Sequence, residues 1–281
     1  MYPKMDVNIF SDVLNNNGWI EAIKYKDKYI PNSLYKYCSL LDENYADFIN
    51  KNKKKLDSLR ENKLWVSNYR QFNDPFEFKM LALDVDKLSR TNWEIDRLEE
   101  LLGMFKDRTL VTCFSSQIDD NMPMWAHYAN NHKGYCIKYS VLNPRTIFPV
   151  QYEPKRSKCA VIPTMIANEI AKSYSQGLKE PTDEFYKYFT YVYLSFCCKH
   201  SFWKYEEEYR LLYQNIDVVN GESIRLQDVG LKIEAIYIGY KCEDNYKKEL
   251  INIGSEIGCE VYKMDFDEYD ENFKLKSTRI I

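Results

Sequence analysis

The sequence has few histidines and no long apolar run, and both shortages narrow the possible functions. Its histidines are His127, His132 and His200, which are too few for the clustered ligands of a zinc site. The chain contains no run of 18 apolar residues, so we expect no membrane span, and its first residues predict no secretion signal. Eight cysteines are scattered without a CxxC pair, which favours a reducing, cytoplasmic location.

An excess of charge of one sign is also missing, and so are the standard cofactor motifs. Lys and Arg number 39 against 42 Asp and Glu, a net charge of −3, so no global basic field indicates nucleic-acid binding, although a local groove could still bind it. The chain lacks GxxxxGK[ST], GxGxxG, HExxH and GxSxG. These absences argue against kinases, metalloproteases, α/β hydrolases and dinucleotide dehydrogenases. The basic run KNKKK at 51–55 is expected at the solvated end of a helix, where cations suit the helix dipole.

Hydrophobic periodicity predicts strands interspersed with helices of unequal length. Strands are expected at 33–40, 63–68, 108–115, 134–141, 147–152 (beside 134–141), 235–239 and 260–266. Helices are expected at 42–55, 84–105, 119–131, 160–177, 182–200 and 243–257. Because no repeat or linker divides the chain, we expect one α+β domain over residues 1–281, with a helical insertion near 160–200. Its central sheet should be mixed and mostly antiparallel, with flanking helices, and residues 216–281 should complete it.

The segment from Phe202 to Leu212, FWKYEEEYRLL, places two carboxylates two residues apart. In an extended strand Glu206 and Glu208 would point to one face. Like charges side by side repel unless a cation, a ligand or a proton compensates them, and such pairs often mark catalytic sites. The simpler alternative is a solvated strand edge on which Arg210 is the local counter-charge.

Two short segments combine aromatic and basic side chains. In Tyr35-Lys36-Tyr37 a strand would place the lysine on the face opposite to the two tyrosines, which also fits an ordinary half-buried strand. In MPMWAHY a helix would place Trp125 and Tyr128 on one side, either as core or as a pocket wall. His127 faces elsewhere, and it is either a core histidine or a proton donor or ligand contact.

The segment WVSNYRQFNDPFE, which starts at Trp65, ends in a turn signal. Pro75 and the residues before it favour a turn in which the Asn and Asp side chains hydrogen-bond to the nearby backbone. This role is purely structural. In the functional alternative Ser67, Asn73 or Asp74 lines a cleft beside an aromatic wall.

Five segments in this order resemble a bacterial family, domain of unknown function 2971. They are LYKY, LWVSNYRQFNDPFE, CFSS, MWAHYANNHKGYCIKY and W-x-x-E-x-E-Y-R. The matching segments run from Leu34 to about Leu212. The family name implies no firm activity.

The layout also resembles the ADP-ribosyltransferases and the related RNA phosphotransferase-like fold. Those proteins have a first strand with His or Arg, a second strand with an aromatic residue and Ser or Thr, and a late strand with a catalytic Glu, often as E-x-E. The resemblance places Lys36 near the basic position, where it replaces His or Arg. It places Trp65 and Ser67 on the second strand and makes Glu208 the catalytic carboxylate.

This second resemblance implies an NAD-dependent glycosyltransferase that moves ADP-ribose from NAD to a protein or nucleic acid, as a toxin or phage-defence effector would. Cleavage of the nicotinamide–ribose bond develops an oxocarbenium-like cation, which a fixed carboxylate stabilises. The expected catalytic residues are Glu208, Glu206 and His127. The expected nucleotide-binding residues are Lys36, Tyr37, Trp65, Ser67, Asn73, Asp74, Trp125, Tyr128 and Arg210.

Two alternatives remain open. A nuclease would hold a divalent cation with carboxylates from Asp74, Glu77, Glu206 and Glu208. A sensor without enzymatic activity would bind a ligand or a protein partner in the aromatic cleft. It predicts that the two glutamates of the E-x-E segment face solvent, far from Lys36 and Asn73.

Overall fold

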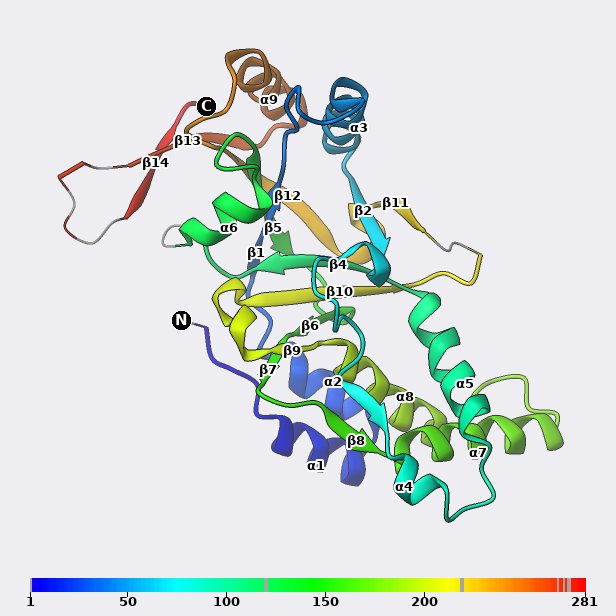
Figure 1. Cartoon of the computed structure of the whole chain (residues 1–281). Helices are drawn as coiled ribbons and strands as arrows, with labels where there is room; N and C mark the ends of the chain where they lie inside the picture. Colours follow the sequence, from blue (N-terminus) through cyan, green and yellow to red (C-terminus); the bar gives the residue numbers. More distant parts are fainter. Residues whose placement is uncertain (1, 119–120, 218–219, 267, 270, 272–273) are drawn as a thin grey trace.

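A curled, mostly antiparallel sheet occupies the middle of the molecule, and helices flank it (Figure 1). This computed structural model describes residues 2–118, 121–217, 220–266, 268–269, 271 and 274–281. The strands of the sheet are β1 (Ser33–Cys38), β2 (Lys63–Asn68), β4 (Thr109–Ser115), β5 (Tyr135–Val141), β6 (Ile147–Pro149), β10 (Glu208–Gln214), β11 (Gly221–Arg225), β12 (Leu231–Ile238), β13 (Glu260–Phe266) and β14 (Leu275–Arg279). Their order is β11-β2-β4-β1-β5-β12-β13-β14, with β10 beside β4 and β6 beside β10. The β12–β13 pair is parallel and β12–β5 antiparallel, so the expected mixed α+β sheet is confirmed.

The helices gather at two ends of the sheet. They are α1 (Val7–Asn17), α2 (Trp19–Asp27), α3 (Phe48–Arg60), α4 (Val85–Leu88), α5 (Ile95–Asp107), α6 (Met122–Tyr128), α7 (Val161–Ser175), α8 (Asp183–Phe196) and α9 (Asp244–Ile257), with short 3-10 turns η1 (Tyr69–Gln71), η2 (Ser201–Glu206) and η3 (Leu226–Val229). In Figure 1, α3 and α9 lie together at one end, whereas α1, α2, α5, α7 and α8 pack at the other. Among the described residues, every helix is too short or too polar to cross a membrane.

Each helical end has its own apolar core. Side chains of α3 and α9, such as Leu56 and Ile253, pack with Val66 and Ile236 of the sheet. At the other end Phe10 of α1 belongs to a second cluster, together with side chains from α5, α7 and α8. β4 lies between neighbouring strands and is buried along almost its whole length, which its apolar sequence TLVTCFS favours.

Short strands outside the main sheet tie the loops to it. β3 (Leu81–Leu83) pairs with β8 (Ser157–Cys159), and β7 (Gln151–Glu153) pairs with β9 (Cys198–His200), both in parallel. β9 connects α8 to η2 and β10. Its central residue, Lys199, therefore lies beside the start of β10.

The structure corrects two of the sequence-based expectations and confirms a third. The single helix expected over 84–105 is wrong, because the chain turns between α4 and α5. The Thr91 hydroxyl donates to the Leu88 carbonyl (2.7 Å) and accepts from the Trp93 amide (3.2 Å), which ends α4 early. β6 pairs with β10 rather than with β5. The expectation that residues 216–281 complete the sheet is confirmed by β11, β12, β13 and β14.

Candidate functional site

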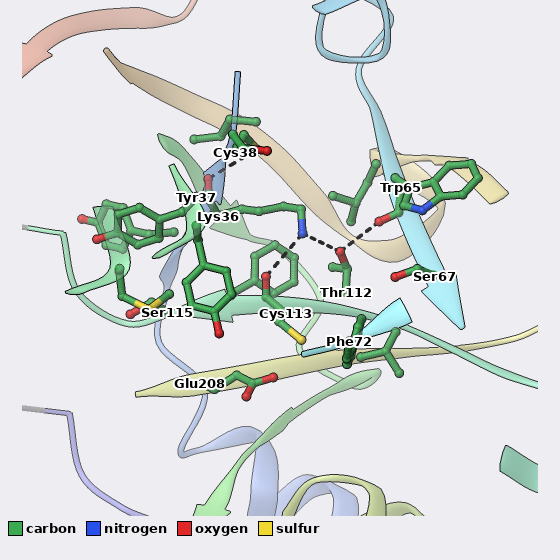
Figure 2. A pocket seen from close by; sticks show the side chains of 18 of the residues that line it. Lys36, Tyr37, Cys38, Trp65, Ser67, Phe72, Thr112, Cys113, Ser115 and Glu208 are labelled. Carbon is green, nitrogen blue, oxygen red and sulfur yellow. Dashed lines mark hydrogen bonds between the residues drawn. The ribbon is translucent and has the colours of Figure 1, made fainter. Parts of the chain in front are cut away.

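The site begins at a fork in the sheet, where β1 and β2 diverge. β10 pairs with β4 from Glu208, opposite Ser115, to Gln214 and so occupies one edge of it. β1 and β2 therefore share the other edge, where Tyr35 also pairs with Ser115 and Ser67 pairs with Val111. Thr112, Cys113 and Phe114 of β4 lie between these two pairings, and Figure 2 shows Lys36 of β1 bonded to Thr112 and Cys113 there.

The fork opens into a cavity of about 480 Å³, a volume typical of small-molecule sites. Its wall is formed by residues of several elements, among them β1, α3, β2, β4, α6, η2, β10 and the loop after η1. Of the site residues expected from the sequence, those that line it are Lys36, Tyr37, Trp65, Ser67, Asn73, Asp74, Tyr128, Glu206 and Glu208. Segments that lie far apart in the sequence therefore meet here, so the placement of the glutamates far from Lys36 and Asn73, which the sensor alternative predicted, is wrong.

Three expected residues do not line this cavity. Trp125 is fully buried and packs edge-on against Tyr37, with ring centroids 5.2 Å apart, so it is a core residue. His127 is exposed on α6, and its ring lies 6.2 Å from that of Tyr205. Arg210 is fully buried behind the carboxylates.

The expectation that Glu206 lies in a strand with Glu208 is wrong, yet the two carboxylates still meet. η2 ends at Glu206, and Glu207 takes a left-handed conformation (φ 42°) before β10 begins. Lys199, at the centre of β9, joins the pair. Its Nζ lies 2.5 Å from Oε2 of Glu206 and 3.0 Å from Oε2 of Glu208.

Arg210 binds the same cluster from the other side. Its Nε donates to Glu208 Oε1 at 2.7 Å and its Nη2 donates to Glu77 Oε2 at 3.0 Å, while Nη1 also donates to the Phe196 carbonyl. Glu206, Glu208 and Arg210 are 2%, 4% and 0% exposed, so the alternative of a solvated strand edge is wrong. Arg210 compensates carboxylates rather than facing a ligand.

Glu77 reaches this cluster from an unusual turn. The next residue, Phe78, has a left-handed backbone (φ 57°), which is strained for a bulky side chain. Its ring stacks between Tyr69 and Phe196, with centroids 5.1 and 4.2 Å away, and this packing holds the turn. Asp74 caps the same turn by accepting from the Phe76 amide (2.8 Å), so the structural role predicted for the Asn-Asp-Pro turn is confirmed although Asp74 also lines the cavity.

The pKa values of the two glutamates are driven apart. Burial raises the pKa of Glu206 to about 7, and the charge of Glu208 adds to this effect. Burial acts on Glu208 in the same direction, but Arg210 and Lys199 outweigh it and hold the pKa of Glu208 below its usual range. Three carboxylates thus face two cations. Burial also raises the pKa of Glu77, and the pKa of about 7 lets Glu206 gain or lose a proton near neutral pH.

The opposite end of the cavity carries uncompensated lysines. Lys36 Nζ donates to Thr112 Oγ1 (2.8 Å), and Lys55 Nζ donates to the carbonyl and the hydroxyl of Ser39 (2.7 and 2.9 Å). Neither lysine forms an ion pair with any described residue. Burial lowers the pKa of Lys55, and the charges of Lys51 and Lys36 lower it further. This end therefore has a positive potential that an anion would relieve.

Several lining residues were not expected from the sequence. No local sequence pattern marks Lys199 and Lys55 as site residues, because strand pairing and helix packing bring their partners to them. Trp203 heads the W-x-x-E-x-E-Y-R segment, and Lys199 Nζ lies 4.9 Å from the centre of its ring. Conversely, Trp65 lines the cavity, but Figure 2 shows its indole pointing away from Lys36.

The carboxylates are arranged for ion pairing rather than for metal binding. Within the described ranges, no three or more His, Cys, Asp and Glu side chains form a group that could hold a metal ion. Glu77 and Glu208, two of the expected nuclease ligands, are bound to Arg210. No observation favours the nuclease alternative.

The fold and the site together define an α+β protein with a cavity whose charged residues are ion-paired at one end and lack a described carboxylate partner at the other. Residues 124–211 match the model of the family described as Protein of unknown function (DUF2971), which supports the resemblance to that family over this segment. The matched range includes Lys199, Glu206, Glu208 and Arg210, whereas Lys36 lies outside it. The comparison with curated proteins and the comparison with solved structures each gave no match.

Proposed function

We propose that this protein is an ADP-ribosyltransferase-like effector that binds NAD in the cavity and transfers ADP-ribose to a protein or nucleic acid. The observation that carries the proposal is the division of one cavity into an end with uncompensated lysines and an end with surplus carboxylate. NAD has the matching polarity, because its diphosphate is negative and its nicotinamide ring is positive. Complementary charge would orient the ligand in one direction.

The lysine end would hold the diphosphate, with contacts from Lys36 and Lys55. The nicotinamide ring would then lie toward Glu206 and Glu208, beside the half-buried ring of Trp203. A ligand in this orientation would place its ribose between the two ends, where the carboxylates can stabilise positive charge.

The reaction would break the bond between the ribose carbon and the nicotinamide nitrogen. The electron pair moves to the ring, and nicotinamide leaves as a neutral molecule. Glu208, which stays ionised because of its lowered pKa, stabilises the cation that develops on the ribose. The acceptor atom forms the new bond to the same carbon, and Glu206, with its pKa of about 7, takes the acceptor's proton.

Release of nicotinamide by the purified protein at millimolar NAD tests the proposal. We expect turnover by the wild type and a loss of about 100-fold or more in Glu206→Gln, as for removal of a general base. His127→Ala is the matched control, since His127 is exposed outside the cavity, and it should retain activity within about twofold of the wild type. Absence of both NAD binding and turnover, with several candidate acceptors present, would contradict the proposal.

A further inference from the structure

α3 carries positive charge that the stability of the helix does not explain. The basic run lies in the N-terminal half of α3, so the expected position at a solvated C-terminal end is wrong. Of the lysines in this run only Lys51 reaches the first turn, where a cation opposes the helix dipole, and Lys51 and Lys55, four residues apart, repel each other. Within the described chain, none of these side chains forms an ion pair; they are Lys51, Lys53, Lys54 and Lys55. The run costs helix stability, which points to a role outside the fold.

Lys51, Lys54 and Lys55 lie on the side of α3 that carries Ser58, and Ser58 connects this side to Trp65 at the cavity mouth. Ser58 lies one turn after Lys54 and Lys55, and its Oγ is 3.4 Å from Oγ of Ser223. Ser223 stands directly opposite Trp65 in the β11–β2 pair, so their side chains share a face of the sheet. Lys55, Ser58 and Trp65 all line the cavity. Figure 1 shows α3 next to β2.

Trp65 is presented to solvent by the backbone beneath it. Its side chain is 50% exposed, although a buried tryptophan would stabilise the fold more. A Cβ added at Gly221 would lie 2.8 Å from the indole, so only glycine leaves room for the ring at this position. One part of the indole is therefore held against β11, and the rest stays open.

We propose that α3 and Trp65 bind a single-stranded nucleic acid at the mouth of the cavity. The phosphates would lie on Lys51 and Lys54, and an unstacked base would lie on the open face of Trp65. Unpaired lysines beside an exposed aromatic ring are the combination that single strands require. An acidic protein segment would satisfy the lysines but would leave Trp65 unused. The inference rests on the proposed function in one respect, since it makes this strand the acceptor of ADP-ribose.

Fluorescence anisotropy with a labelled oligothymidylate of about 12 nucleotides, titrated at several salt concentrations, tests this inference. Lys51→Gln with Lys54→Gln should weaken binding about 10-fold. The slope of log K against log[salt] should become less negative by about 1.4, because each phosphate contact on a single strand contributes about 0.7 to it. Trp65→Ala should weaken binding about 10-fold with little change in that slope. The matched control, Lys155→Gln with Lys179→Gln, removes two exposed lysines elsewhere and should bind as the wild type does.

Three results would overturn the inference: no binding at low salt, equal weakening by both double substitutions, or unchanged affinity in Trp65→Ala. Preferential binding of an acidic peptide over the oligonucleotide would also overturn it. Calorimetry with NAD on the Lys51 and Lys54 variant separates this inference from the proposed function. A wild type that binds the oligonucleotide but not NAD would refute the proposed function and leave the strand site standing.

Discussion

The two ends of the cavity differ in how their charges are compensated. At one end three carboxylates are buried with two cations, Lys199 and Arg210, and every member bonds to another. At the other end Lys36 and Lys55 bond to hydroxyl and carbonyl oxygens and lack a carboxylate partner among the described residues. The first end is therefore part of the fold as well as of the site. The second can be changed with little effect on stability and should act mainly on ligand binding.

The largest expected effect is the loss of stability in Arg210→Met. This change leaves Glu77 buried without a cation and Glu208 with Lys199 as its remaining cation, which costs about 3–5 kcal/mol of unfolding free energy. Arg60→Met is the matched control, because Arg60 also pairs with several carboxylates but is 34% exposed, and we expect a loss of about 1 kcal/mol or less. Urea denaturation monitored by circular dichroism measures both; similar losses would contradict the distinction between the two sites.

A smaller effect concerns the pH dependence of stability. The pKa of Glu206 is raised to about 7 in the folded protein, so between its ordinary value and 7 the folded state binds more protons than the unfolded state. Stability should therefore fall as pH rises through this window, by at most about 3 kcal/mol from this group. Glu206→Gln should show a flatter curve in urea denaturation between pH 5 and 7.5. An identical slope in wild type and variant would show that Glu206 titrates normally.

At the lysine end, Lys36→Gln should weaken NAD binding about 10-fold while it changes the unfolding free energy by less than about 1 kcal/mol. Lys63→Gln provides the control within the same cavity, because Lys63 lines it but is paired with Glu61 at 2.6 Å. We expect a change of less than about twofold in NAD affinity there. Calorimetry at moderate salt measures both affinities, and equal weakening would mean that the missing carboxylate partner of Lys36 does not matter.

Local patterns were sufficient to predict the elements that build the fork. Alternation of bulky and polar residues predicted β1, and the apolar run TLVTCF predicted β4; with β2 and β5 these strands were expected close to their observed bounds. The resemblance to the ADP-ribosyltransferases selected Lys36 and Glu208, which the fold brings to one cavity. The fork itself was not predicted, because it arises where two strands distant in sequence share one edge of β4.

The compensation of charge was also beyond local reasoning. Lys199 joins Glu206 and Glu208 only because β9 pairs with β7 and turns back into η2. The left-handed Glu207 separates the two glutamates into different elements, and no sequence signal indicated this residue. Whether Arg210 faced a ligand or the core depended on which face of β10 was covered, which is a property of tertiary packing.

The most direct test of the divided cavity compares NAD⁺ with NADH, two ligands that share the diphosphate but differ in the charge of the nicotinamide ring. At pH 8, where Glu206 is ionised, calorimetry should show NAD⁺ bound about 10-fold more tightly than NADH by the wild type. Glu206→Gln should remove most of this preference, whereas Lys36→Gln should weaken both ligands equally. A wild type that binds both ligands equally, or a preference that survives in Glu206→Gln, would contradict the account.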